Sequence, residues 1–241
     1  MKVVIRPGSV AGALWGVGQR VGLDEHEAHH LKVRRARDGE TVEVLDGAGF
    51  TGTGILVQSG REWLVEVRSG HMQPPPAPLT LAVAMGDRDR FSWMVEKSVE
   101  LGVTRMVPLQ TERTASVATR LKDVHLDRLR RSALDATKQC GAAWVPAIDV
   151  PRAFTAFARE PVGGTAWLAD ACGAPAPASL NDGAVTVIIG PEGGLTSTER
   201  DTVVGAGYRL VSLGPHTLRF ETAAVAAAAA VTHARMRRPH G

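Results

Sequence analysis

The pattern of apolar and polar positions changes near residue 73. Before that point, apolar residues alternate with polar ones in short runs separated by turns such as Asp46-Gly47. Period-two alternation predicts strands with one buried face, and several short strands predict a small, mostly antiparallel β-barrel. Between the first two strands, the sequence HEAHHLKVRRARDGE predicts a short helix. The expected strands are residues 3–5, 40–45, 54–57 and 63–67.

A proline run at residues 74–78 follows, and such runs act as semi-rigid spacers between domains. Beyond it, strand-like and helix-like segments alternate, which predicts a parallel sheet covered on both faces. We therefore expect one domain at residues 1–73 and a second at 79–241. The second domain should contain strands at 79–84, 105–109 and 166–169 and helices at 91–101, 121–140, 153–159 and 222–237.

Residues 184–231 form the most distinctive stretch, because they hold two glycine-bearing turns that each connect an apolar strand to a helix. The first turn is Gly190-Pro191-Glu192-Gly193-Gly194 and the second is Leu213-Gly214-Pro215. Either turn alone has an ordinary explanation as a tight bend. Two such turns at the ends of neighbouring strands favour a ligand site. Thr196 and Glu199 have the spacing of a capping box, which predicts that a helix begins there.

The last predicted helix is nearly all alanine on several sides. Simple helix propensity is one explanation. We favour the other, in which small side chains allow close packing against a second helix, either within the chain or across a dimer.

Composition limits the class of protein. The chain has 241 residues, 44% hydrophobic and 22% charged, as is ordinary for a globular protein. A formal charge of +3 suits a polyanionic partner without requiring one. Cys140 and Cys172 do not make a disulfide framework, and we expect reduced, buried thiols. With neither a membrane span nor a signal peptide in the pattern, a cytoplasmic protein is expected.

One segment matches a zinc-peptidase template. In His26-Glu27-Ala28-His29-His30, two histidines stand one helical turn apart, with a glutamate in the position of a general base. The segment lies in the small domain, a basic run follows it at once, and the sequence offers no evident third ligand. We therefore expect no metal, and histidines that face solvent or cap the helix.

Two further groups of charged residues have both an ordinary and a functional interpretation. The basic run near the first helix is either a solvated face or a phosphate-binding patch, to which Arg6 would add. Its members are Lys32, Arg34, Arg35 and Arg37. Arg219 and Glu221 are either a helix cap with a surface charge, or groups that stabilise a transition state at the mouth of a site. The chain has no Walker A or G-x-G-x-x-G motif, which disfavours phosphate-bearing cofactors.

The segments IIGPEGGLTSTE and LGPHTLRFETAAVAA resemble the RsmE family of 16S ribosomal RNA uridine N3-methyltransferases, which belong to the SPOUT class. The segments KSVELGVTRMVPLQTERT, KQCG and HHLKVRRARDGETVEVLDG resemble the same family in the same order. The resemblance thus extends over essentially the whole chain. One departure is Phe220, which stands where many relatives have threonine and so removes a polar group from that position.

The resemblance implies a PUA-like RNA-binding barrel, then an α/β SPOUT domain with a C-terminal trefoil knot near residues 165–225. It also implies a homodimer that binds 16S rRNA or the small ribosomal subunit and methylates the uridine conventionally numbered 1498. S-adenosylmethionine would be held by three loops. The implied cofactor-binding residues are Leu168, Ala169, Gly190, Pro191, Glu192, Gly193, Gly194, Leu213, Gly214, Leu218, Thr222 and Ala223.

For the reaction, the uridine N3 must lose its proton, and negative charge then spreads onto O2 and O4. A guanidinium near those oxygens would stabilise the transition state, and we assign that role to Arg219. Glu221 would act as the base or orient Arg219, and the sequence does not decide between the two. The alternatives are a SPOUT enzyme for another RNA base or tRNA, and a non-catalytic RNA-binding protein.

Overall fold

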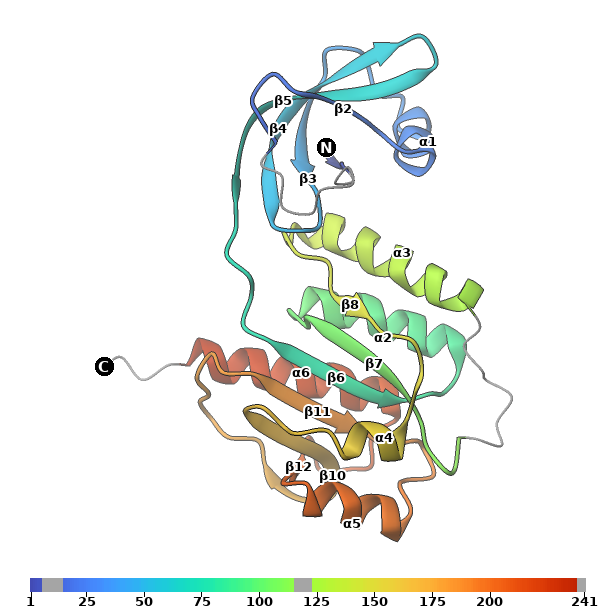
Figure 1. Cartoon of the computed structure of the whole chain (residues 1–241), viewed down its shortest axis with the longest axis vertical. Helices are drawn as coiled ribbons and strands as arrows, with labels where there is room; N and C mark the ends of the chain where they lie inside the picture. Colours follow the sequence, from blue (N-terminus) through green and yellow to red (C-terminus); the bar gives the residue numbers. More distant parts are fainter. Residues whose placement is uncertain (6–14, 115–122, 238–241) are drawn as a thin grey trace. The chain divides into compact units, whose positions relative to one another are not determined.

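The computed structural model describes residues 1–5, 15–114 and 123–237, and it forms two compact units (Figure 1). The first unit is Met1–Pro75 together with Leu134–Val145, and the second is Pro76–Ala133 together with Pro146–Gly241. The division between Pro75 and Pro76 falls inside the proline run. A single boundary at the proline run assigns Leu134–Val145 to the second domain, whereas in the structure these residues belong to the first unit.

The first unit is built on a five-stranded sheet in the order β1-β3-β4-β5-β2. β1 pairs with β3 in parallel and every other ladder is antiparallel, so the predicted mostly antiparallel character is confirmed. These ladders do not join β1 to β2, and a closed barrel stays a prediction. The strands are β1 (Lys2–Val4), β2 (Arg20–Gly22), β3 (Thr41–Leu45), β4 (Phe50–Ser59) and β5 (Glu62–Met72).

Alternation along these strands builds one core. Val42 and Val44 of β3, with Val65 and Val67 of β5, are at most 2% exposed, while the residues between them are less buried. Helix α1 (Glu25–Val33) adds Leu31 to the same core. The helix begins after Asp24, whose carboxylate accepts a hydrogen bond from the Glu27 N–H, the usual N-cap contact.

The second unit contains a seven-stranded sheet in the order β12-β10-β11-β6-β7-β8, in which β9 also pairs with β7. All of its ladders are parallel, as the alternation of strands and helices predicts. The strands are β6 (Leu79–Ala84), β7 (Arg105–Gln110), β8 (Ala147–Ile148), β9 (Arg152–Ala153), β10 (Thr165–Pro175), β11 (Val185–Ile189) and β12 (Arg209–Ser212).

Helices lie on both faces of this sheet (Figure 1). α4 and α5 pack on one face, where Phe154, Phe157 and Val203 meet strand residues in a single buried cluster. α6 packs against α2 and against the central strands β6 and β11. Thr196 caps α5 through the predicted capping box. The helices of the second unit are α2 (Arg88–Glu100), α4 (Phe154–Ala158), α5 (Ser197–Gly205) and α6 (Phe220–Met236), and α3 (Asp123–Cys140) has residues in both units.

The alanines of α6 allow close packing against α2. Ala224, Ala227 and Ala228 have no exposed surface, so packing within the chain accounts for much of the unusual composition. Phe220 begins the helix and packs against Phe91 of α2, with ring centroids 6.2 Å apart. Its apolar surroundings explain how a phenylalanine is accommodated at this position.

Some expectations about single elements were wrong. Both cysteines are exposed rather than buried, because Cys140 is the last residue of α3 and Cys172 lies within the register shift of β10 between Ala169 and Ala174. The strands β2, β8 and β9 were not predicted, since each has only two or three residues and none contains a run of three apolar residues such as Val3–Ile5. Among the described residues, no helix combines the length and the apolar character that crossing a membrane requires.

Candidate functional site

A cavity of about 300 Å³ lies where the carboxyl ends of β11 and β12 meet the middle of β10. β10 lies between the other two strands in the sheet, so three segments that are distant in sequence converge there. Loops beyond the carboxyl ends of parallel strands are the usual ligand-binding position in open α/β sheets. The volume of the cavity is at the lower end of the range for small-molecule sites.

The first wall is the glycine turn after β11. Gly194 has a φ of +73°, a conformation that disfavours any residue with a Cβ. At Gly190, an added Cβ would lie 3.3 Å from Leu195 Cγ, so this position has little spare room. The Arg113 guanidinium donates hydrogen bonds to the carbonyl oxygens of Gly193 and Gly194. This arginine fixes the turn from a loop about 80 residues earlier, and no motif in the sequence marks that interaction.

The second wall follows β12. Leu213 and Gly214 line the cavity, and the Ser212 hydroxyl donates a hydrogen bond of 3.1 Å to the Gly214 carbonyl. Leu218 lies against Gly214, where an added Cβ would be 3.8 Å from Leu218 Cδ1. The wall therefore presents a mostly apolar surface at the N-terminal side of α6.

The third wall is the middle of β10, where the pairing with β11 stops at Leu168 and Ala169 and Asp170 follow. Asp170 accepts hydrogen bonds from the Cys172 N–H at 2.8 Å and from Arg200 Nε at 3.0 Å. Burial raises the pKa of Asp170, but these two donors outweigh it, so the pKa lies below its ordinary value. The hydrogen bond to Asp170 likewise raises the pKa of Arg200. Asp170, which ends the first of the three cofactor loops that the resemblance implies, thus forms a charge pair at the cavity with Arg200, a partner that the sequence did not indicate.

Beside the cavity, two carboxylates face one arginine. Arg90 of α2 donates from Nη1 to Glu192 at 3.0 Å, and its Nε lies 3.8 Å from Oε1 of Glu221. Glu221 is 8% exposed, and within the described part its Oε2 has no hydrogen-bond partner. Arg219 is the N-cap residue of α6, and it is exposed.

The structure brings most of the residues in the predicted cofactor set to one cavity. Gly193 and Thr222 do not line it, and neither do Arg219 and Glu221, although their chain neighbours do. Their assignment to cofactor binding or catalysis stays a prediction. The predicted residues that do line the cavity are Leu168, Ala169, Gly190, Pro191, Glu192, Gly194, Leu213, Gly214, Leu218 and Ala223.

The basic run is exposed at the end of α1 and in the turn that follows it. Lys32 belongs to the helix, and Arg34, Arg35 and Arg37 come after its last turn. This exposure is compatible with both a solvated face and an RNA-binding patch. Arg6, which was expected to extend the run, lies outside the described residues.

The peptidase interpretation of the H-E-x-x-H segment is excluded by the position of Glu27. This residue is 3% exposed, and its carboxylate accepts hydrogen bonds from Lys138 Nζ at 2.8 and 2.7 Å and from the Val4 N–H at 3.3 Å. A carboxylate held in this way inside the unit is not free to activate a water molecule for peptide hydrolysis.

The geometry defines a class, an α/β protein with a ligand cavity at the carboxyl edge of a parallel sheet and a separate small β unit. Two family models match the chain. The RNA methyltransferase domain matches residues 73–232, and the RNA methyltransferase PUA domain matches residues 23–68.

Individual relatives agree with these family models. Ribosomal RNA small subunit methyltransferase E of Synechocystis sp. is 32% identical over 223 residues, covering 88% of this chain and 72% of that protein. The chain belongs to the ribosomal RNA small subunit methyltransferase E family of RNA methyltransferases.

Solved structures share the fold. The crystal structure of ribosomal RNA small subunit methyltransferase E from Neisseria gonorrhoeae, bound to S-adenosylmethionine, is 28% identical, with a TM-score of 0.83 and 95% of each chain covered. A Legionella pneumophila methyltransferase in complex with the same cofactor is 26% identical, with a TM-score of 0.80, and the match covers 95% of this chain and 96% of that one.

Proposed function

We propose that this protein transfers a methyl group from S-adenosylmethionine to N3 of a uridine in 16S ribosomal RNA, the position conventionally numbered 1498. The observation that carries the proposal is the cavity formed by the middle of β10 and the loops after β11 and β12. Family membership supports the same activity, and so do the two similar structures whose names include the cofactor.

The residues of the cavity suit such a ligand. The glycine turn at residues 190–194 exposes backbone groups, while Leu168, Leu213 and Leu218 supply apolar surface for a base or a sugar face. Glu192 and Asp170 add carboxylate oxygens at the cavity, each held by an arginine, Arg90 and Arg200 respectively. When bound, the cofactor supplies an electrophilic methyl group.

Arg219 is the proposed catalytic residue, because it is an exposed cation at the edge of the cavity, next to Leu218. There it would stabilise negative charge that develops on the uridine oxygens. For Glu221, the nearby Arg90 supports a positioning role, since the carboxylate already faces a guanidinium rather than open solvent. The variant E221Q distinguishes the roles, because glutamine can still accept a hydrogen bond but cannot take up the proton: activity should be lost if Glu221 is the base and partly kept if it positions Arg219.

The first unit is proposed to bind RNA. It contains the region matched by the PUA model, and Lys32, Arg34, Arg35 and Arg37 supply cations for phosphate contacts. A single-stranded or splayed target is expected, because N3 is inaccessible in a base-paired duplex.

We also propose the knot and the homodimer that are typical of this class. The return of the chain from the edge strand β12 to the central strands, where α6 packs on β6 and β11, supports a knot near residues 165–225. Trp93 of α2 is 46% exposed, as an apolar side chain at a dimer interface would be in a single protomer. Light scattering of the purified protein tests the dimer, for which the expected mass is twice 25.5 kDa.

The proposed activity is tested by incubating the full-length protein with labelled S-adenosylmethionine and three substrates: unmethylated small ribosomal subunits, free rRNA and tRNA. We expect label in 16S rRNA as 3-methyluridine. Label in another nucleoside, or in tRNA alone, would favour a related methyltransferase of different specificity. Failure to bind the cofactor in a calorimetric titration would favour a non-catalytic RNA-binding protein.

A further inference from the structure

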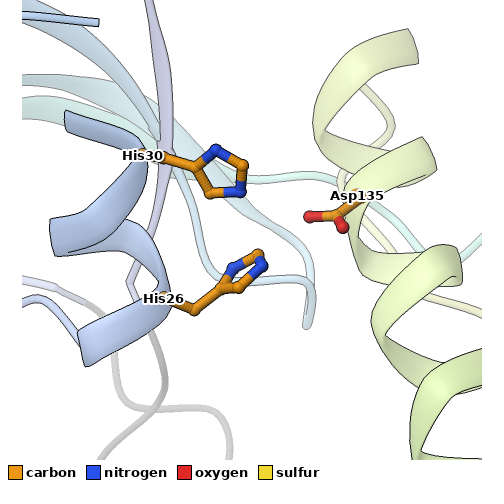
Figure 2. A group of neighbouring side chains, drawn as sticks. All are labelled: His26, His30 and Asp135. Carbon is orange, nitrogen blue, oxygen red and sulfur yellow. The ribbon is translucent and has the colours of Figure 1, made fainter. Parts of the chain in front are cut away.

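Three side chains in the first unit converge on one point at its surface. His26 and His30 lie one turn apart on α1, and Asp135 of α3 faces them (Figure 2). One ligand-type atom from each residue lies within 4.8 Å of the other two. The two imidazole rings meet edge to face, with their centroids 4.5 Å apart. The sequence showed the two histidines, but not the carboxylate more than 100 positions away.

A buried ion pair between Glu27 of α1 and Lys138 of α3 lies beside this group and connects the two helices. Glu27 follows His26 on α1, and Lys138 is three residues after Asp135 on α3. Lys138 donates to both carboxylate oxygens of Glu27, which also accepts from the Val4 N–H of β1. The Glu27 side chain is only 4% exposed, so this network fixes both helices where the cluster forms. It also neutralises the Lys138 charge, which would otherwise repel a cation.

We propose that His26, His30 and Asp135 form a zinc site. Two imidazoles and one carboxylate are a donor set that Zn²⁺ accepts, with a fourth position left for water. At metal–ligand distances of about 2.0 to 2.1 Å, tetrahedral ligand atoms stand roughly 3.4 Å apart. The ligand atoms already lie within 4.8 Å of one another, and rotation of the exposed His26 and Asp135 side chains would bring them to that spacing on binding.

The site is structural rather than catalytic. Glu27, the residue that the peptidase template would make a general base, is already bound to Lys138. A bound ion would instead tie α1 to the segment Leu134–Val145, which belongs to the same compact unit but lies far away in the sequence. Metal binding would thus stabilise the first unit at the point where two distant chain segments meet.

The test is equilibrium dialysis of the tag-free, full-length protein against Zn²⁺, followed by elemental analysis. We expect one equivalent of zinc per chain. The variants H26A, H30A and D135N should each bind zinc at least about tenfold more weakly. H29A is the matched control, because His29 is exposed on the same helix but outside the cluster, and it should bind zinc as the wild-type protein does.

A second measurement checks that the ligand atoms surround the ion. Co²⁺ added in place of Zn²⁺ should give the intense visible absorption of a tetrahedral ion, and D135N, which is nearly isosteric, should lose it while its far-ultraviolet circular dichroism is unchanged. Zinc should also raise the melting temperature of wild-type protein but not of D135N. Substoichiometric zinc in the wild-type protein, or equal binding by D135N, overturns the proposal without affecting the proposed methyltransferase activity.

Discussion

Arg90 of α2 donates a hydrogen bond of 3.0 Å to Glu192 in the glycine turn, 102 residues later in the chain. The same guanidinium lies 3.8 Å from the buried Glu221 at the start of α6. One arginine therefore connects a wall of the cavity with a predicted catalytic residue, and neither sequence spacing nor motif indicated it.

Replacing Arg90 with alanine should lower the methylation kcat/KM by about tenfold, or ~1.4 kcal/mol, because Glu192 and Glu221 would no longer face the cation that positions them. The exposed Arg90–Glu192 pair contributes little stability, so a fall in melting temperature would come from leaving the buried Glu221 without its cation. R88A is the control, because Arg88 is an exposed arginine at the start of the same helix. Equal activity in R90A and R88A would argue against a positioning role.

Replacing Gly194 with alanine should destabilise the turn by about 1 kcal/mol, because the residue has a φ of +73°. We expect weaker binding of S-adenosylmethionine by calorimetry. G205A is a matched control: Gly205 ends α5 with a negative φ and open space around it, and alanine there should be neutral or slightly stabilising. If G194A binds the cofactor as tightly as G205A does, the turn is not part of the site.

The Asp170–Arg200 pair predicts a pH dependence of stability. Because the folded-state pKa of Asp170 lies below its ordinary value, the stabilisation is fully present above about pH 4 and is lost as the pH falls through the folded pKa. D170N should thus cost up to about 1 kcal/mol at neutral pH. In urea denaturation, the difference between wild type and D170N should shrink on acidification. A difference that stays constant with pH would mean that the carboxylate charge does not stabilise the fold.

The basic run leads to a salt-dependent prediction. Replacing Lys32, Arg34, Arg35 and Arg37 with alanine should weaken rRNA binding and reduce the slope of log K against log salt by about 0.7 to 0.9 for each phosphate that is no longer neutralised. Cofactor affinity should be unaffected. R61A, at an exposed hairpin turn of the same unit, is the control. If the slope of log K against log salt is unchanged in the quadruple variant, the basic run faces solvent and does not contact RNA phosphates.

The sequence pattern predicted what depends on local periodicity. The parallel sheet of the second unit, the capping box at Thr196 and both glycine turns follow from apolar runs and turn residues that are close in the chain. Side-chain pairs between segments that are distant in the sequence could not be predicted from it. Lys138 meets Glu27 across 111 positions, and Arg113 meets Gly193 across 80. No periodicity marks such partners, so the proposed third ligand beside His26 and His30 was missed as well.

The most direct test of the central claim compares wild-type protein with R219A on unmethylated small ribosomal subunits, using nucleoside digestion and mass spectrometry. The wild-type protein should produce 3-methyluridine in 16S rRNA. R219A should produce none detectable, while its affinity for S-adenosylmethionine stays within about tenfold, or roughly 1.4 kcal/mol. A different methylated nucleoside from the wild-type protein would contradict the assigned reaction, and full activity of R219A would remove Arg219 from its mechanism.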